Sequence, residues 1–473
     1  MNWPAVSLEL AVAGLAVVVL LADLFAPRGA VRRTGAGLHA LATVGLAAIL
    51  VASFRIPETA QSFTAAWVQD PFAVYVKRIV LATAALVALA AWPHAAARGW
   101  SRRSGEFLVL LLFAALGAMA LTSARELLTL FVAFELLSVP TYALAALDKR
   151  RPEAPEGALK LFLFGSVSSA LLLLGIGMLL ASTGTTFWQS VGPIRDHGLF
   201  DLGVALVVAG FGFKIAMAPF YLWVPDTYQA APTPLVAFLS IAPKAAAVAV
   251  LFRLYFELFE GRVPGLAGWL AVLSAVTMTV GNLLALPQRD LKRMLAYSGV
   301  AHVGYVLAAL AAASRFGAGM ALFYFVAYLL SNAGAFLALA AVEAGGEAAT
   351  LDGVRNLVRR SPAIASALLV FLLSLGGIPF VLGFWGKMYV FLAAARAGLW
   401  WLVFLGALLA VVALFYYLNV ARWMFIVKDD DAGPVPAHPA VLAAVLLCAV
   451  AVTLGGLVPA WFVEPALRAV GSL

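Results

Sequence analysis

Two lysines occupy an apolar stretch of the sequence that prolines interrupt repeatedly. Lys214 and Lys244 lie within residues 210–244, and prolines stand at positions 219, 225, 232, 234 and 243. An ionisable group inside a membrane costs about 2.5–3.5 kcal/mol or more, and lipid cannot satisfy a backbone hydrogen bond that proline opens. Such groups mark functional sites by default, and the chemistry that a lysine offers is the uptake and release of a proton.

Lysine, rather than arginine, is the cation found deep in the apolar segments. Four of the eight lysines are predicted well inside helices, whereas none of the 23 arginines lies at comparable depth: Lys160, Lys214, Lys244 and Lys387. Arginine keeps its proton, while a buried lysine changes its protonation state readily. Glu135 is the one carboxylate and His302 the one histidine predicted at central depth. This composition favours proton transfer over structural ion pairing.

Each candidate also has a structural interpretation. Lys160 lies four residues inside its predicted helix and Lys387 near the outer end of another, so both can extend their amines toward the membrane surface. Lys214, Lys244 and Glu135 can form a static ion pair, and His302 can be a satisfied core residue. Four acids at predicted helix ends are expected to be solvated: Asp23, Glu126, Asp226 and Glu343.

Prolines accompany the candidate residues. Pro219 and Pro140 each follow a candidate, Lys214 and Glu135 respectively, by five positions, and Pro243 directly precedes Lys244. A proline inside a helix leaves a carbonyl without its donor. Such carbonyls can hold the waters along which a proton moves, although each proline can also be an ordinary kink.

Composition places the chain in a membrane. It has 473 residues, 64% hydrophobic and 11% charged, where a soluble domain has about 25% charged. Cys448 is the single cysteine, which excludes a cysteine-ligated iron–sulfur cluster, a cysteine zinc site and an internal disulfide. The first residues lack the basic start of a cleaved signal peptide, so the first helix is expected to be retained. The net charge of +8 comes from short loops between spans, which argues against nucleic-acid binding.

Apolar runs of about 20 residues predict an all-α polytopic membrane protein. We expect about fourteen transmembrane helices: 5–25, 35–54, 71–92, 105–122, 126–147, 156–180, 199–224, 233–255, 264–286, 291–312, 318–342, 362–395, 399–425 and 439–461. The outer segments 55–70 and 182–198 are predicted to be short loops or a hairpin, and 343–361 the main cytoplasmic loop.

Loop charges orient these helices. Alternate loops carry 17 lysines and arginines, and the loops and tail on the other side carry 7. The positive-inside rule places the first set in the cytoplasm and both termini on the periplasmic side.

Two units of five helices follow from this count. Helices 4–8 and 9–13 must be inverted relative to each other because five is odd, and each has a proline-interrupted fourth helix, at AMAPF (216–220) and GGIPF (376–380). Paired interrupted helices in inverted repeats are typical of transporter ion sites. We therefore expect one membrane domain, 1–473, with these parts: 1–104 (helices 1–3), 105–260 (first repeat), 261–427 (second repeat) and 428–473 (helix 14 and tail).

Five stretches of the chain resemble the antiporter-like subunits of respiratory complex I, most of all the N subunit. They are FELLSVPTYALAAL (134–147), ALKLFLFGS (158–166), residues 210–244, GNLLALPQRDLKRMLAYSGVAHVGY (281–305) and GIPFVLGFWGKMYVF (377–391). Lysine in helix 12 distinguishes the chain from the M subunit and from the D subunit of Mrp antiporters, which usually have glutamate there. The sequence also ends without the long lateral helix of the L subunit. ALKLF stands where the family often has ALKYF.

The resemblance implies roles for the candidate residues. Glu135 would pair with Lys214, Lys244 would be the central lysine, and Lys387 would lie toward the far side. Lys160 would be an extra lysine and His302 part of the connecting polar chain.

The resemblance also implies the setting of the chain. It would be a proton-translocating subunit of an NADH:quinone oxidoreductase in the bacterial inner membrane. It would have no redox cofactor or metal of its own, since NADH, FMN, iron–sulfur clusters and quinone would belong to partner subunits. K-type and M-type subunits, the lateral helix of the L subunit and lipid would surround it. Alternatives are a subunit of an Mrp-type cation/proton antiporter or a related membrane-bound hydrogenase, and a structural membrane spacer.

Overall fold

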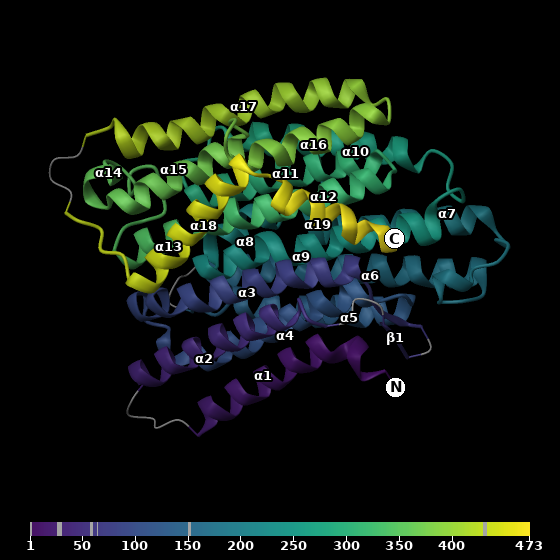
Figure 1. Cartoon of the computed structure of the whole chain (residues 1–473), viewed down its shortest axis with the longest axis horizontal. Coiled ribbons are helices and arrows are strands. Elements are labelled where there is room, and N and C mark those ends of the chain that lie inside the picture. Colours follow the sequence, from purple (N-terminus) through teal and green to yellow (C-terminus); the bar gives the residue numbers. More distant parts are fainter. Residues whose placement is uncertain (1, 26–30, 57–59, 64, 150–152, 429–432) are drawn as a thin grey trace.

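The chain folds into a bundle of long helices. The computed structural model describes residues 2–25, 31–56, 60–63, 65–149, 153–428 and 433–473. The helices lie side by side along the long axis of the view, with α1 at one edge and α17 at the other (Figure 1). The start of α1 and the C-terminus lie toward the same end of the bundle, and α14 lies at the opposite end (Figure 1).

The first part of the bundle follows a 3₁₀ turn at Trp3–Val6. Its helices are α1 (Ser7–Leu24), α2 (Val31–Ala52), α3 (Pro71–Arg98), α4 (Ser104–Ser123), α5 (Leu127–Ala145), α6 (Glu153–Thr183), α7 (His197–Ile215), α8 (Val224–Ala230) and α9 (Thr233–Leu254). The hairpin predicted as one possibility for 55–70 is confirmed, because β1 (Ala60–Ser62) pairs antiparallel with β2 (Trp67–Gln69). A π-helical segment, η4 (Tyr255–Phe259), extends α9.

The second part begins with α10. Its elements are α10 (Leu266–Ala285), α11 (Leu291–Ala311), α12 (Arg315–Tyr328), the π-helical η5 (Leu329–Ala333), α13 (Gly334–Ala344), α14 (Leu357–Arg360), α15 (Pro362–Gly376), α16 (Leu382–Arg396), α17 (Trp400–Phe425), α18 (Pro439–Leu457) and α19 (Ala460–Ala469). The π-helical segment joins α12 to α13 without a break, so that the three form one apolar helix, Arg315–Ala344.

The predicted set of membrane helices is confirmed. Among the described residues, thirteen helices are long and apolar enough to cross a membrane. The remaining predicted span, 362–395, is divided into α15 and α16, each too short to cross alone, as its excess length indicated. Structure and sequence therefore agree on fourteen membrane segments, one of which is made of two half-length helices.

Both predicted interruptions are present. Helix α7 ends at Ile215, and Ala216 takes the left-handed conformation with φ 64°; α15 ends at Gly376, and Gly377 takes φ 86°. The prolines of AMAPF and GGIPF follow these residues and cannot restore the helical hydrogen bonds. Each interruption leaves carbonyl groups that other donors can reach. The inverted relation of the two five-helix units stays a prediction.

Two helices form the interior of the bundle. All 22 residues of α9 are buried, and so is the most apolar window of α11. A helix surrounded by protein can carry polar side chains that lipid would not tolerate. The residues of α9 and α11 are therefore the ones best placed to hold a polar path across the membrane.

Cysteine labelling tests the orientation that the loop charges predict. The side chains at Arg102, Arg359 and Ser190 are exposed, while the native Cys448 is fully buried and should stay silent. Cysteines at 102 and 359 should react with an impermeant maleimide only from the cytoplasm, and a cysteine at 190 only from outside. Labelling of all three from one face would contradict the predicted topology.

Candidate functional site

Lys214 lies at the end of α7, where the helix is interrupted. Its amine donates a 2.7 Å hydrogen bond to Ser138 Oγ on α5 and lies 4.5 Å from the centre of the Phe134 ring. Glu135 lies on the same stretch of α5 and accepts a hydrogen bond from Ser169 of α6. In the described structure each of the two predicted partners thus binds a serine rather than the other partner. Glu135 and Ser138, which binds Lys214, are one helical turn apart on α5.

Lys244 lies at the centre of α9 and is fully buried. Its amine donates to the backbone carbonyl of Gly299 on α11 at 3.3 Å. A Cβ at Gly299 would lie 2.9 Å from Tyr328 Oη and 3.1 Å from Lys244 Nζ, so the hydroxyl and the amine converge on this glycine. Tyr328 Oη is buried and has no hydrogen-bond partner among the described residues.

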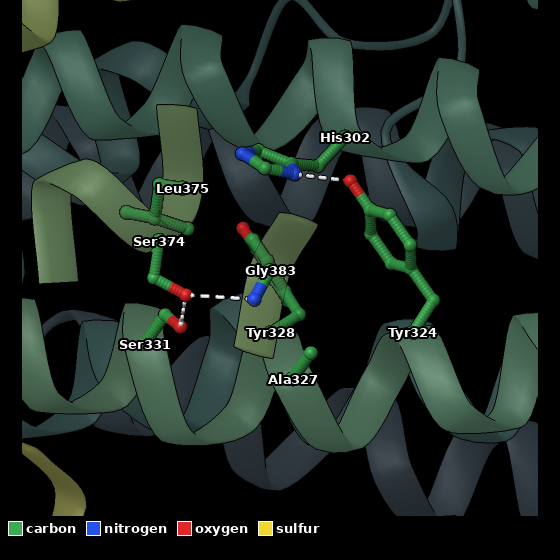
Figure 2. Close-up of a pocket in the computed structure, with 8 residues that line it drawn as sticks. All are labelled: His302, Tyr324, Ala327, Tyr328, Ser331, Ser374, Leu375 and Gly383. Carbon is green, nitrogen blue, oxygen red and sulfur yellow. Dashed lines mark hydrogen bonds between the residues drawn. The ribbon is translucent and has the colours of Figure 1, made fainter. Parts of the chain in front are cut away.

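His302 joins two tyrosines beside a small cavity. Its Nδ1 is 2.5 Å from Tyr324 Oη, and its Nε2 is 3.2 Å from Tyr417 Oη. The cavity measures about 10 Å³ for a water-sized sphere, close to the smallest volume that holds one water molecule. Figure 2 shows the residues that line it: His302, Tyr324, Ala327, Tyr328, Ser331, Ser374, Leu375 and Gly383.

Lys387 lies on α16, beside the second interruption. Its amine donates to the carbonyl of Gly376, the last residue of α15, at 2.9 Å and lies 5.0 Å from the centre of the Tyr305 ring. Asn282 donates to Tyr305 Oη at 3.2 Å and accepts from Tyr416 Oη at 3.2 Å. Lys387, Tyr305, Asn282 and Tyr416 therefore form a polar group next to His302, Tyr324 and Tyr417, which we call the His302 cluster.

Lys160 is placed differently from the other three lysines. Its side chain is 37% exposed and forms ion pairs of 2.7 Å with Glu156 and with Asp226. This arrangement matches the surface alternative for Lys160 better than a central role. Asp226 also pairs with Arg293 at 2.5 Å, so it is partly exposed, as expected, but ion-paired to two helices. Burial alone would raise the pKa of Asp226, but hydrogen bonds from Lys160 and Arg293 outweigh it and hold the pKa below its usual value.

Two further acids expected to be solvated are in fact buried. Glu126 caps α5 by accepting from the backbone of Leu128 and Thr129 at 3.0 and 2.6 Å. Burial would raise the pKa of Glu126, but hydrogen bonds from the Thr186 side chain and from the backbone of Thr129 and Leu128 lower it overall. Glu343 lies 3.0 Å from His94 Nε2 and accepts from Thr233 Oγ1 at 2.5 Å. The two carboxylates are covered in different ways: the backbone of its own helix binds Glu126, whereas His94 of α3 and Thr233 of α9 bind Glu343.

Sequence reasoning missed three buried cations. Lys77 pairs with Glu9 at 2.6 Å, Arg253 with Asp70 at 2.9 Å, and Lys292 lies 3.8 Å from Glu343. Glu9 and Lys77 stand inside predicted apolar helices, a signal that was available. The pairings themselves join distant helices, and no spacing in the sequence reveals them.

Metal and cofactor binding are not supported by any cluster in the described part of the chain. No group of three or more histidine, cysteine, aspartate or glutamate side chains there is placed to hold a metal ion. The expectation that redox groups belong to partner subunits stays a prediction.

Interrupted helices with buried lysines beside them define a class of protein, the antiporter-like membrane subunits. Residues 124–413 match the family model described as "NADH:quinone oxidoreductase/Mrp antiporter, TM". The chain belongs to this family.

Relatives and solved structures match nearly the whole chain. NADH-quinone oxidoreductase subunit N of Heliobacterium modesticaldum is 37% identical and aligns over 100% of both chains, and that of Rubrobacter xylanophilus is 40% identical over 90% of this chain and 89% of the relative. A chain of Thermus thermophilus respiratory complex I with bound aureothin has a TM-score of 0.82 and 34% identity, covering 98% of this chain and 99% of that one. A chain of the Mrp complex from Dietzia sp. DQ12-45-1b shares the fold, with a TM-score of 0.86, 19% identity, and 100% and 98% covered.

Proposed function

We propose that this chain is a proton-translocating membrane subunit of a bacterial NADH:quinone oxidoreductase. Full-length similarity to chains named as subunit N supports this assignment, together with the likeness to a complex I chain from Thermus thermophilus. As in the sequence-based expectation, the subunit would belong to a translocase whose redox chemistry takes place in its partners.

One observation carries the proposal: the buried cations fall into two kinds. Lys77 and Arg253 each pair with a carboxylate, which holds their charge in place. Lys214, Lys244 and Lys387 bind only neutral oxygens within the described structure, those of Ser138, Gly299 and Gly376. A neutral oxygen does not fix the charge of the amine, because it accepts a hydrogen bond from the protonated and from the neutral form. These three lysines can therefore release a proton.

The proton would move along the line of candidate residues. Glu135 approaches Lys214 or withdraws from it, and the change in charge beside Lys214 alters the proton affinity of Lys244 in turn. From Lys244 the proton passes Gly299 and Tyr328 and reaches the His302 cluster. The centres of the Tyr328 and His302 rings are 5.0 Å apart. Tyr305 lies between His302 and Lys387, with ring-to-ring and amine-to-ring distances of 5.9 and 5.0 Å. Lys160 would tune this path from the surface.

Energy for the movement would come from partner subunits. NADH, FMN, iron–sulfur clusters and quinone would lie there, and the redox energy would arrive through shifts in charge or conformation. K-type and M-type subunits and the lateral helix of an L subunit would be the neighbours. The chain would lie in the bacterial inner membrane with both termini on the periplasmic side.

A cation/proton antiporter subunit is the second candidate. The Mrp chain from Dietzia supports it by fold alone, at 19% identity. Sodium-stimulated exchange in the absence of NADH would favour that candidate. A structural spacer, the remaining alternative, would leave proton transport unchanged when the buried lysines are neutralised.

Replacement of Lys244 tests the proposal. Lys244→Met keeps the volume but removes the titrating group, and Lys244→Arg keeps a charge that cannot leave. Both should reduce NADH-driven proton uptake by inverted membrane vesicles by about tenfold or more, the lower range of what a positioned proton-transfer group contributes. Uptake is measured per assembled complex, with exposed Lys428→Met as the control. Full uptake by the arginine variant would show that charge, not titration, matters at this position.

Gly299→Ala tests the contact beside Lys244. The added methyl group would displace Tyr328 Oη and Lys244 Nζ, which are the mobile ends of their side chains, so the fold should persist. Alanine also favours the helix by roughly 0.5–1 kcal/mol over glycine. We expect an assembled complex of normal thermal stability that has lost most of its proton uptake. The control is Gly268→Ala, whose methyl group meets nothing within 4 Å, and equal uptake by the two variants would contradict the role of this contact.

A further inference from the structure

A second buried polar cluster lies where α3, α9, α11 and α13 meet. It consists of His94, Thr233, Lys292 and Glu343, each no more than 5% exposed. None of these residues belongs to the path proposed above. The cluster lies at the first turn of α9, and Arg253 lies at the last turn. The loop charges assign the end with the cluster to the cytoplasm.

The carboxylate of Glu343 holds the cluster together. One oxygen accepts from Thr233 Oγ1 at 2.5 Å and lies 3.0 Å from His94 Nε2, and the other lies 3.8 Å from Lys292 Nζ. Lys292 donates to the carbonyl of Ala231 at 2.9 Å and to Thr233 Oγ1 at 3.2 Å. A carboxylate and an imidazole in direct contact can exchange a proton without moving.

The cluster reaches the aqueous edge of the protein. Arg98 lies 3.7 Å from the second oxygen of Glu343 and is one-third exposed. The Asp290 carboxyl, which caps α11, lies near Lys292 and Glu343, and burial raises its pKa. His94 Nδ1 is buried and has no hydrogen-bond partner among the described residues, so the imidazole keeps one site open for a proton. Glu343 therefore contacts His94 directly, and Arg98, Lys292 and Asp290 are the ionisable groups around that carboxylate.

A row of polar residues runs along α9 from this cluster toward Lys244. Thr233, Ser240 and Lys244 are spaced by seven and four positions, which places them on one face of α9. The length of helix from Thr233 to Lys244 is about 16 Å. Asn332, on η5, donates to Ser240 Oγ at 2.8 Å and has a buried carbonyl oxygen without a partner among the described residues. On α11, Lys292 and Gly299 are likewise seven positions apart.

We propose that the His94–Glu343 couple is the proton-loading site for Lys244. The proposal rests on the function proposed above and adds the point of proton entry. The couple takes one proton from water at the end of the bundle that the loop charges assign to the cytoplasm, past Arg98. It then passes one proton along the row of Thr233 and Ser240 to the neutral amine of Lys244. The couple then returns to its starting state, and Lys244 becomes an ammonium. Lys292 keeps the Glu343 carboxylate in place while the proton moves.

The test uses variants that keep the contacts but remove the proton chemistry. His94→Gln can still donate to Glu343 but cannot take up a proton, and Thr233→Val removes the hydroxyl while Thr233→Ser keeps it. Asp352→Asn removes an exposed acid outside the cluster as the control. Each variant is assayed in the whole complex, in inverted membrane vesicles, for NADH-driven proton uptake across a range of pH.

We expect His94→Gln and Thr233→Val to reduce uptake by about tenfold, within the lower range of positioned proton-transfer groups. The loss should grow as the pH rises, because the remaining route depends on protons taken directly from bulk water. Thr233→Ser and Asp352→Asn should keep the parental rate and pH profile. A purely structural cluster would lower assembly without changing the pH profile of the complexes that form.

Two results separate this inference from the function proposed above. If Lys244→Met retains parental uptake, the proposed function itself fails. If Lys244→Met loses uptake while His94→Gln and Thr233→Val keep the parental rate and pH profile, the chain translocates protons but loads them elsewhere. If His94→Gln does not assemble, the comparison of Thr233→Val with Thr233→Ser decides alone, because valine and serine are both close to threonine in volume.

Discussion

An ammonium group buried among helices must find oxygen acceptors, and the kind of acceptor decides what the group can do. Removing a charge from water costs several kcal/mol, which a carboxylate in good geometry offsets by fixing the charge. Asp70 offsets the charge of Arg253 in this way, because it accepts hydrogen bonds of 2.9 Å from both Nη1 and Nη2 of the guanidinium. Burial would raise the pKa of Asp70, but Arg253 outweighs it and lowers that pKa, so the pair stays ionised at neutral pH. Lys244 is bound to a carbonyl oxygen instead, and no carboxylate among the described residues forms an ion pair with it.

Two of the three lysines, Lys214 and Lys387, meet their acceptors where a helix is interrupted. The end of α15 presents the Gly376 carbonyl to Lys387, and the end of α7 brings Lys214 to the hydroxyl of Ser138. The π-helical segment η5 carries Ser331 and Asn332 into the interior, where Ser331 is 2.7 Å from Ser374 beside the cavity (Figure 2). Such irregularities need protein around them in a membrane, and the burial of α9 and of the most apolar part of α11 shows that protein surrounds the interior. The bundle and the polar path therefore depend on each other.

Much of this arrangement follows from the sequence. Apolar length predicts the membrane segments, and proline predicts where two of them are interrupted. Lysine in an apolar run predicts candidates for the path, although Lys77 shows that such a lysine can also be paired with a carboxylate. The surface alternative for Lys160 was also open from its position near a helix end. These signals are local, and the predicted membrane segments and the two interruptions are confirmed, while the path through the lysines stays a prediction.

The rest depends on contacts between distant parts of the chain. Glu343 stands at a helix end, which predicts solvation, yet His94, 249 positions away, covers it. Glu135 and Lys214 are close in space, but two serines from different helices decide which hydrogen bonds form. The convergence of Lys244 and Tyr328 on Gly299 is equally invisible in the sequence, where Gly299 is one of 40 glycines.

The central claim is that protons cross this chain through lysines that give up their charge. The most direct measurement is the number of protons moved per NADH oxidised, in vesicles that contain the whole complex with Lys214, Lys244 and Lys387 all replaced by methionine. The account predicts fewer protons per NADH, or NADH oxidation that slows in step with proton uptake. A parental ratio at the parental rate of NADH oxidation would contradict it and leave the chain as a structural part of the membrane arm.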